Sequence, residues 1–236
     1  IFTAKGRPST DPLIVHVASL DEVPALVKDV PDLVHTLAAR FWPGPLTLIL
    51  PKSKAVPDEV TAGLDTVALR VPSHPVARRL PSAAVVPVAA PSANLFSRPS
   101  PTRPEHVLED LSARVDLLID GGPTTVGVES TVLDLSTGVP TILRPGAVTL
   151  EMVREVIPTV RLRDTRDEAG EPLRSPGLLA RHYAPRAPLT LYEGSAARVV
   201  ARIVRDAGAA AAEGRRVGIL AADEDPIHGF TIVRAG

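Results

Sequence analysis

The first cluster of residues that could do chemistry is Lys5-Gly6-Arg7-Pro8, which puts two cations two positions apart. In an extended segment, side chains two positions apart point to the same face. Lysine supplies a point charge and arginine a planar fork, a combination suited to phosphate. Because short basic clusters are also common as solvated turns, these four residues alone leave both interpretations open.

A second cluster, Ala90-Pro91-Ser92-Ala93-Asn94, follows an apolar run at 85–90. Proteins of the α/β class place ligands at the carboxyl ends of strands. A hydroxyl and an amide can bind a nucleotide without charge repulsion. An ordinary Asx or Ser turn would use the same residues, so the spacing does not decide between the two.

The third cluster is Gly127-Val128-Glu129-Ser130-Thr131, which could cradle an anion. No lysine follows the glycine at P-loop spacing, and there is no Gly-x-Ser-x-Gly elbow. Glu129 could act as a base, although an isolated glutamate is usually a surface residue. This cluster therefore predicts an anion site without a nucleophile.

The histidines and the missing cysteines limit metal chemistry. None of the six histidines forms a His-x-x-x-His pair, and there is no cysteine. Disulfides, thiolate zinc sites and a cysteine nucleophile are excluded, and no tightly bound metal is expected. Magnesium carried in by a nucleotide remains open, because this ion often has few protein ligands.

Composition excludes several classes of protein. The 236 residues are 44% hydrophobic and 22% charged, which is ordinary for a globular protein. A net charge of −1 argues against a protein that coats nucleic acid, and 3% aromatic residues disfavour a base-stacking surface. No apolar run approaches the ~20 residues of a membrane helix and no secretory signal is visible, so we expect a cytoplasmic protein.

These clusters need elements to position them, and the hydrophobic pattern alternates between strand-like and helix-like segments. Strands are predicted over 13–17, 46–50, 66–71, 85–90, 115–119, 130–135 and 141–143. Helices are predicted from Asp21, over 32–41, from an N-cap at Thr102, and over 149–156. A charged stretch with Pro and Gly over 161–181 reads as a linker or long loop, and a βαβ unit follows with a strand at 189–192, a helix at 196–212 and a strand at 216–220.

Taken together, the motifs resemble the YrdC-like family. Its Lys-x-Arg and Ser-x-Asn signatures are Lys5/Arg7 and Ser92/Asn94. The runs that carry the resemblance between them are Asp11-Pro12-Leu13-Ile14-Val15-His16, Phe41-Trp42-Pro43-Gly44-Pro45-Leu46-Thr47 and Val67-Ala68-Leu69-Arg70-Val71-Pro72 with His74. Later, Ser175-Pro176-Gly177 and His182-Tyr183-Ala184-Pro185 are similar to the long, two-domain members, which are L-threonylcarbamoyladenylate synthases.

The resemblance implies an α/β (α+β) fold: a twisted mixed sheet with a concave cavity, plus a small Rossmann-like βαβ domain. The expected domains are a catalytic domain over 1–158, a linker over 159–187 that reaches over the active site, and part of a C-terminal domain over 188–236. We expect residues to be missing at both ends, because Ile1 is not an initiator methionine. The missing N-terminal segment would hold further substrate contacts.

The resemblance also implies a reaction. L-threonine, bicarbonate and ATP, with Mg²⁺, give threonylcarbamoyl-AMP, pyrophosphate and water, which makes the enzyme a nucleotidyltransferase. Other enzymes then transfer the threonylcarbamoyl group to tRNA, forming N6-threonylcarbamoyladenosine. The expected partners are the three substrates and those transfer enzymes, with at most weak tRNA binding and no membrane.

Site residues follow by matching positions. Lys5 and Arg7 match the residues beside the triphosphate, and they are the expected catalytic residues. The expected ATP contacts are Lys5, Arg7, Asp11 (where the family often has Asn), Thr66, Ser92, Asn94, Ser100, Arg144 and Tyr183. The expected L-threonine contacts are His16, Arg70, Ala90 (through its backbone) and Ser130.

Two alternatives stay open. One is a YrdC-like enzyme that adenylates carbamoyl phosphate, although such proteins carry zinc fingers and this chain has no cysteine. The other is an RNA-binding module, which the net charge of −1 and the few aromatic residues disfavour.

Overall fold

The computed structural model describes residues 1–163, 184–185 and 187–234. The chain divides into two compact units, Ile1–Arg186 and Ala187–Gly236, and each is described by itself. The predicted linker over 159–187 lies largely outside the described residues. No helix in the described ranges is long and apolar enough to cross a membrane.

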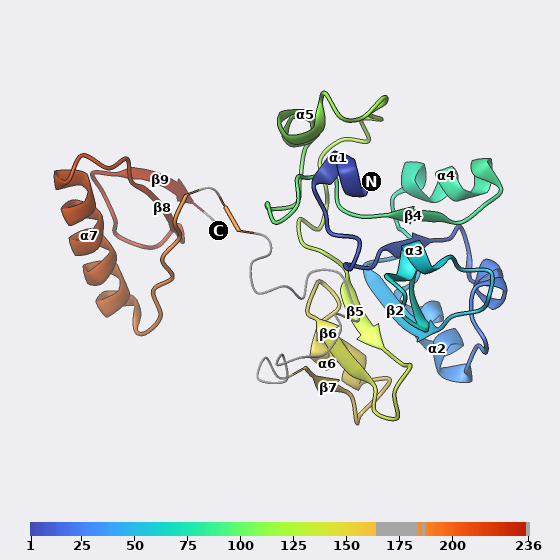
Figure 1. The fold of residues 1–236 in the computed structure, drawn as a ribbon. Coiled ribbons are helices and arrows are strands. Elements are labelled where there is room, and N and C mark those ends of the chain that lie inside the picture. Colours follow the sequence, from blue (N-terminus) through green and yellow to red (C-terminus); the bar gives the residue numbers. More distant parts are fainter. Residues whose placement is uncertain (164–183, 186, 235–236) are drawn as a thin grey trace. The chain divides into compact units, whose positions relative to one another are not determined.

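A seven-stranded sheet forms the first unit, in the order β4-β1-β3-β2-β5-β6-β7 (Figure 1). The strands are β1 (Ile14–His16), β2 (Leu46–Pro51), β3 (Thr66–Arg70), β4 (Val88–Ala90), β5 (Thr131–Asp134), β6 (Thr141–Arg144) and β7 (Arg161–Leu162). The pairs β1–β3, β2–β5 and β6–β7 are parallel, and the other three neighbouring pairs are antiparallel. The predicted mixed sheet is therefore confirmed.

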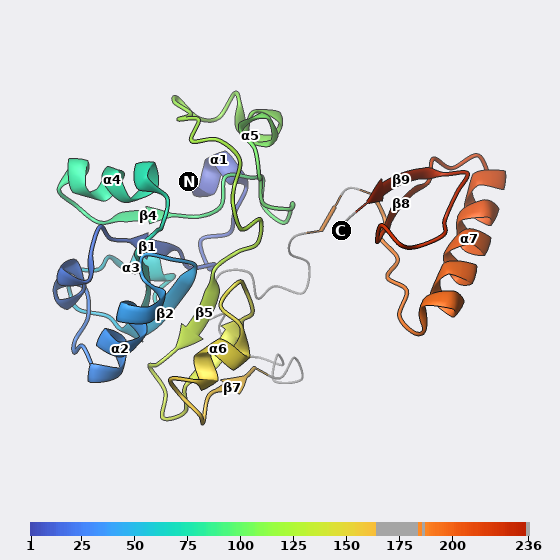
Figure 2. The ribbon, with the colours of Figure 1, turned by 180° about the vertical axis from the view of Figure 1, so that it is seen from behind.

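Helices surround this sheet, and both faces of its centre are buried. They are α1 (Phe2–Lys5), a 3-10 helix η1 (Leu20–Ala25), α2 (Asp32–Phe41), α3 (Asp58–Thr61), α4 (Pro75–Ala84), α5 (Pro104–Leu111) and α6 (Leu150–Arg154). Seen from behind, α6 lies over β5 and β6 (Figure 2), and its Val153 belongs to the same buried cluster as Leu133 and Ile142.

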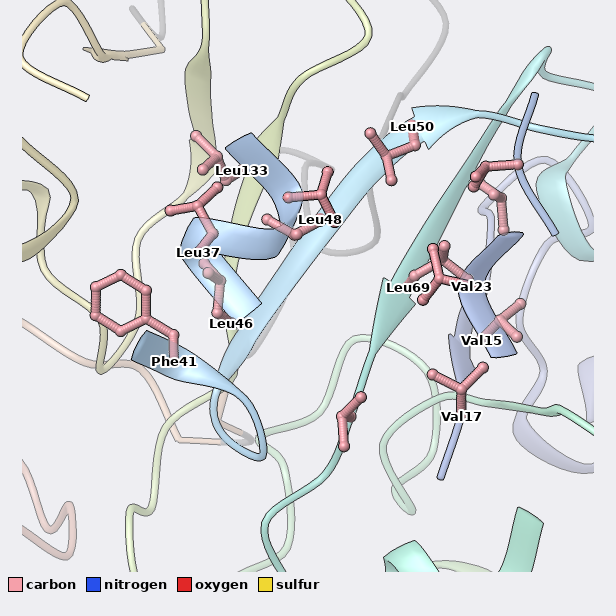
Figure 3. Packing of buried hydrophobic residues seen from close by; sticks show 14 of the residues in the cluster. Val15, Val17, Val23, Leu37, Phe41, Leu46, Leu48, Leu50, Leu69 and Leu133 are labelled. Carbon is pink, nitrogen blue, oxygen red and sulfur yellow. The ribbon is translucent and has the colours of Figure 1, made fainter. Parts of the chain in front are cut away.

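Apolar residues at helical spacing attach α2 to β2. Val34, Leu37, Ala38 and Phe41 are buried at positions i, i+3, i+4 and i+7 of the helix. Leu37 and Phe41 pack near Leu46 and Leu48 of β2, as Figure 3 shows. Alternate β2 residues face the other way, so Ile49 packs with Ile14, Ala68 and Val132. The sheet centre is thus a fixed frame for the loops at its edge.

Some predicted elements are wrong. The strand predicted over 85–90 begins only at Val88, because α4 occupies 75–84 and Val85 ends it in a left-handed conformation with φ 56°. Residues 115–119 form no strand, and Leu117 and Ile119 are exposed. Thr102 is not the N-cap of α5, because Arg103 takes that position and Thr102 contacts the His106 ring.

The second unit is small. Helix α7 (Ala196–Ala212) has the predicted bounds and packs on two parallel strands, β8 (Gly218–Ala221) and β9 (Thr231–Arg234). The strand predicted over 189–192 is absent from the described residues, and Leu189 and Leu191 are exposed there. The predicted small C-terminal α/β unit is confirmed, but its first strand is not.

Candidate active site

A cavity of about 470 Å³ opens beside the strand ends of the first unit. Its wall combines Arg7, which follows α1, and residues of β1, β3, β4 and β6 with the segments 90–102 and 121–130. The predicted site residues that line it are Arg7, His16, Arg70, Ala90, Ser92, Ser100, Ser130 and Arg144. Residues spread over more than 130 positions of the chain thus meet in one cavity.

Arg7 is held by the turn that follows it. Its Nη2 donates to the Pro12 carbonyl at 2.7 Å and lies 3.0 Å from the Asp11 carboxylate. Asp11 is fully buried and does not line the cavity. Burial raises the pKa of Asp11, while the charges of Arg7, Arg144 and Lys5 oppose that rise. Asp11 therefore orients Arg7 from behind.

Lys5 also lies behind the cavity wall. Its side chain is buried, and its Nζ donates to the Ser92 carbonyl at 2.5 Å and to the Asn94 carbonyl. Burial, followed by the nearby charge of Arg7, lowers the pKa of Lys5 to about 8. Lys5 thus ties the loop over 92–94 to α1 and does not line the cavity.

Asn94 has a similar internal role. The side chain is buried, and its Nδ2 donates to the carbonyls of Leu95 at 2.7 Å and Arg98 at 2.9 Å. In the Lys-x-Arg and Ser-x-Asn signatures, Arg7 and Ser92 face the cavity while Lys5 and Asn94 build the loop. The two signatures are therefore one physical unit.

Arg144 and Ser130 form a second fixed group. Arg144 Nη2 donates to the Ser130 carbonyl at 2.9 Å and lies 3.0 Å from the Ser130 Oγ. Thr47 Oγ1 is 2.8 Å from the same Oγ. Gly146 lies against this segment, because a Cβ there would come within 2.4 Å of the Glu129 carbonyl oxygen. A side chain at Gly146 would therefore displace Ser130 and Arg144.

Arg70 and His16 lie side by side at the ends of β3 and β1, which pair in parallel. Arg70 Nε donates to the Gly44 carbonyl at 2.9 Å, and its Nη atoms have no hydrogen-bond partner among the described residues. Burial, followed by the charge of Arg144, lowers the pKa of Arg70. Its planar fork is open to a carboxylate.

His16 is neutral at neutral pH. Burial, followed by the charge of Arg70, lowers its pKa to about 4. Its Nδ1 is buried without a hydrogen-bond partner in the part of the chain that is described. Such an unpaired polar atom on a cavity wall is a natural contact for a bound ligand.

Thr66, like Lys5, Asp11 and Asn94, is a predicted ATP contact that does not line the cavity. Thr66 begins β3, four positions before Arg70, and so lies about 13 Å along the strand from it. Tyr183 lies outside the described residues, although the neighbouring Ala184 N–H donates to the Ser97 carbonyl at 2.9 Å. The chain after Tyr183 therefore contacts the loop that carries the Ser-x-Asn signature.

Sequence reasoning singled out 127–131 but missed residues 121–126 of the cavity wall. Glu129 lines the cavity, and its Oε1 accepts a hydrogen bond from Ser100 Oγ at 2.5 Å. His74 Nε2 lies 3.2 Å from the Gly121 carbonyl oxygen on the same wall. The Gly-x-x-Ser-Thr spacing singled out this segment, but nothing in it indicated that Glu129 would pair with Ser100.

Comparison with known proteins agrees with this geometry. A family model described as Sua5_yciO_yrdC, telomere recombination, matches residues 1–146, and one described as threonylcarbamoyl-AMP synthase, C-terminal domain, matches residues 148–234. A solved structure titled as Pyrococcus abyssi Sua5 complexed with L-threonine has a TM-score of 0.93 and 42% identity, covering all of this chain and 69% of that one. The E. coli YciO structure has a TM-score of 0.54 and 28% identity, covering 62% of this chain and 71% of the other.

Curated relatives carry the same family name. The threonylcarbamoyl-AMP synthase of Bacillus subtilis is 47% identical over 95% of this chain and 64% of its own length. The synthase of Pyrococcus abyssi is 45% identical over 93% and 65%. The chain thus spans slightly less than two thirds of these two relatives. The motifs, the sheet and these matches together establish that the chain belongs to the Sua5/YciO/YrdC family.

Proposed function

We propose that this chain makes L-threonylcarbamoyl-AMP from L-threonine, bicarbonate and ATP, releasing pyrophosphate. The observation that carries the proposal is a single cavity lined by Arg7, Arg70 and Arg144, three guanidinium groups on fixed supports. Three such cations fit a triphosphate and a carboxylate together. The relatives named threonylcarbamoyl-AMP synthase support the same activity.

ATP would bind at Arg7 and Arg144, the cations that Asp11 and Ser130 hold in place. Arg7 and Arg144 would bind the phosphates, and Arg7 would stabilise the charge of the departing pyrophosphate. Ser92 would add a neutral contact from the loop. Lys5 and Asn94 would act through that loop, because Lys5 Nζ and Asn94 Nδ2 donate to its carbonyls.

L-threonine would bind at Arg70 and His16 in the same cavity. The Nη atoms of Arg70, which have no hydrogen-bond partner among the described residues, would hold its carboxylate, and neutral His16 would offer an uncharged hydrogen-bonding nitrogen beside it. Ser130 and the Ala90 backbone complete the predicted contacts. A neutral His16 avoids placing another cation against the ammonium or amine of the amino acid.

The chemistry needs positioning more than a nucleophile. The threonine amine attacks carbon dioxide and loses a proton to form a carbamate, or it attacks bicarbonate and the same carbamate forms with release of water. A carbamate oxygen then attacks the α-phosphorus of ATP, and the bond to pyrophosphate breaks. Holding the two reactants in line and stabilising the leaving pyrophosphate can supply most of the acceleration.

ATP would enter as its magnesium complex. No group of three or more His, Asp or Glu side chains that could hold a metal occurs among the described residues. Phosphate oxygens and water would therefore supply most of the magnesium ligands, which is usual for this ion. Such an enzyme would work in the cytoplasm and deliver its product to enzymes that modify tRNA. The linker with Tyr183 would close over the nucleotide.

The test uses the full-length protein with ATP, Mg²⁺ and bicarbonate, with and without L-threonine. Mass spectrometry measures threonylcarbamoyl-AMP, and a parallel assay measures pyrophosphate. We expect both products only when threonine is present. Pyrophosphate without the adduct, or product formation that requires carbamoyl phosphate, would refute the proposal.

A further inference from the structure

The cavity wall holds one carboxylate among its cations. Of the described residues that line the cavity, Glu129 is the one acidic side chain, whereas Arg7, Arg70 and Arg144 are positive. Glu129 is partly buried, and its Oε1 accepts a hydrogen bond from Ser100 Oγ at 2.5 Å. Its Oε2 has no hydrogen-bond partner in the described ranges. A negative group in a cavity built for anions requires an explanation.

The pairing fixes what Ser100 can offer a ligand. A hydroxyl has one proton, and Ser100 uses it in the hydrogen bond to Glu129, so only its lone pairs are left to accept from a ligand. The two side chains together therefore present acceptors and negative charge. A phosphate oxygen placed there would meet no donor and would be repelled. The matching ligand group must donate hydrogen bonds.

The position of Glu129 and Ser100 relative to the arginines indicates which group of the ligand would lie beside them. Glu129 directly precedes Ser130, whose carbonyl and hydroxyl hold Arg144. Consecutive Cα atoms are about 3.8 Å apart. The Glu129 side chain therefore begins beside Ser130, which holds Arg144, the residue proposed to bind phosphate. In ATP, the group next to the α-phosphate is the ribose. Its vicinal hydroxyls are two donors, which match the acceptors of a carboxylate and a serine.

We propose that Glu129 and Ser100 form a ribose subsite, in which Glu129 Oε2 accepts the 2′-hydroxyl of ATP. This inference rests on the proposed function and deepens it. It orients ATP in the cavity, with the triphosphate at Arg7 and Arg144 and the nucleoside at Glu129. The carboxylate then selects ribonucleotides and excludes phosphate from the nucleoside end.

The experiment compares kcat/KM for ATP and for 2′-deoxy-ATP in the full-length protein. The variants are Glu129→Gln, which keeps an acceptor for Ser100, and Glu129→Ala, which removes it. Glu109→Gln is the matched control, because Glu109 lies exposed on α5 and does not line the cavity. Thermal unfolding checks that each variant folds, and Glu129→Gln keeps the test valid if the alanine variant does not.

Wild type and the control should prefer ATP by about tenfold or more, the value of one hydrogen bond to a charged group. The preference should shrink in Glu129→Gln and approach one in Glu129→Ala. An unchanged preference in both variants would overturn the inference. So would a raised KM for L-threonine with an unchanged preference, which would assign Glu129 to the ammonium group of the amino acid.

Failure of the proposed function is a separate outcome. If the wild type forms no threonylcarbamoyl-AMP, equilibrium binding of ATP and 2′-deoxy-ATP still measures the preference. Binding that favours ATP in the wild type and not in Glu129→Ala would support the ribose subsite without that activity. Equal binding of the two nucleotides to the wild type would refute the subsite.

Discussion

The buried histidine of the cavity makes the stability of the first unit depend on pH in a defined window. Burial and Arg70 lower the pKa of His16 from 6.5 to about 4. Between these values the unfolded chain binds a proton on His16 and the folded chain does not. The free energy of unfolding must therefore fall as the pH drops through this window, and the contribution is fully present above pH 6.5.

The size of the effect follows from the shift. A difference of about 2.5 pKa units corresponds to about 3 kcal/mol once the pH is below both pKa values. Between pH 7.5 and 5, where other groups interfere less, linkage gives about 2 kcal/mol. The groups that face His16 are Arg70 on β3 and backbone atoms of β1 and β4. Since Arg70 keeps its charge at these pH values, the window belongs to His16.

Urea unfolding at several pH values between 7.5 and 5 measures this, with wild type compared with His16→Gln. Trp42 is the one tryptophan of the chain, and its Nε1 donates to the Leu46 carbonyl at 2.7 Å. Its fluorescence therefore reports unfolding of the first unit alone. His35→Gln is the control, because His35 is exposed on α2.

The difference between wild type and His16→Gln isolates one group. We expect wild type to lose about 2 kcal/mol more than His16→Gln on going from pH 7.5 to 5, and His35→Gln to behave as wild type. Equal pH dependence in wild type and His16→Gln would refute the argument. The histidine would then be charged in the folded state despite its burial beside Arg70.

Three further predictions concern the supports of the site. Gly146→Ala should lower kcat/KM and lower the free energy of unfolding by about 1–3 kcal/mol, because its Cβ meets the backbone of residues 129–131; Gly138→Ala, which has no atom within 4 Å of the added Cβ, should do neither in the same assays. Lys5→Met should weaken ATP binding and reduce the free energy of unfolding by about 2 kcal/mol. The carbonyls of Ser92 and Asn94 lose a charged donor, and this loss is partly offset because the charge of Lys5 is no longer buried. Unchanged urea unfolding would contradict this. Arg70→Lys should raise the KM for L-threonine about tenfold, because the planar guanidinium fork is lost, and should leave the Kd for ATP unchanged. Arg40→Lys on α2 is the control. An equal effect on the Kd for ATP would show that Arg70 does not act on L-threonine alone.

Hydrophobic pattern predicted the sheet centre well and the edges poorly. Runs such as 46–50 became strands because neighbouring strands pair with both of their edges. The run at 115–119 has a similar composition, yet no strand pairs with it among the described residues. A strand needs a partner from elsewhere in the chain, and local pattern cannot supply that information. The same reason applies to 189–192 in the second unit.

The resemblance named residues that the fold brings to one cavity, but side-chain burial decides which of them line it. Lys5 and Arg7 are two positions apart and were expected to act alike, yet one ties a loop and the other faces the cavity. The pairing of Glu129 with Ser100 was not visible in the sequence, because the two residues are 29 positions apart. Such pairings depend on the folded chain and not on local sequence.

This division of roles changes how loss of activity in the signature residues should be interpreted. Replacing Lys5 or Asn94 removes hydrogen bonds to loop carbonyls, so ATP binding and the free energy of unfolding should fall together. Replacing Ser92, which lines the cavity, should change ligand binding with little change in stability. Measurements of activity alone would place all three in one class. Only binding and unfolding measured on the same variants separate the residues that contact a ligand from those that hold the contacting residues in place.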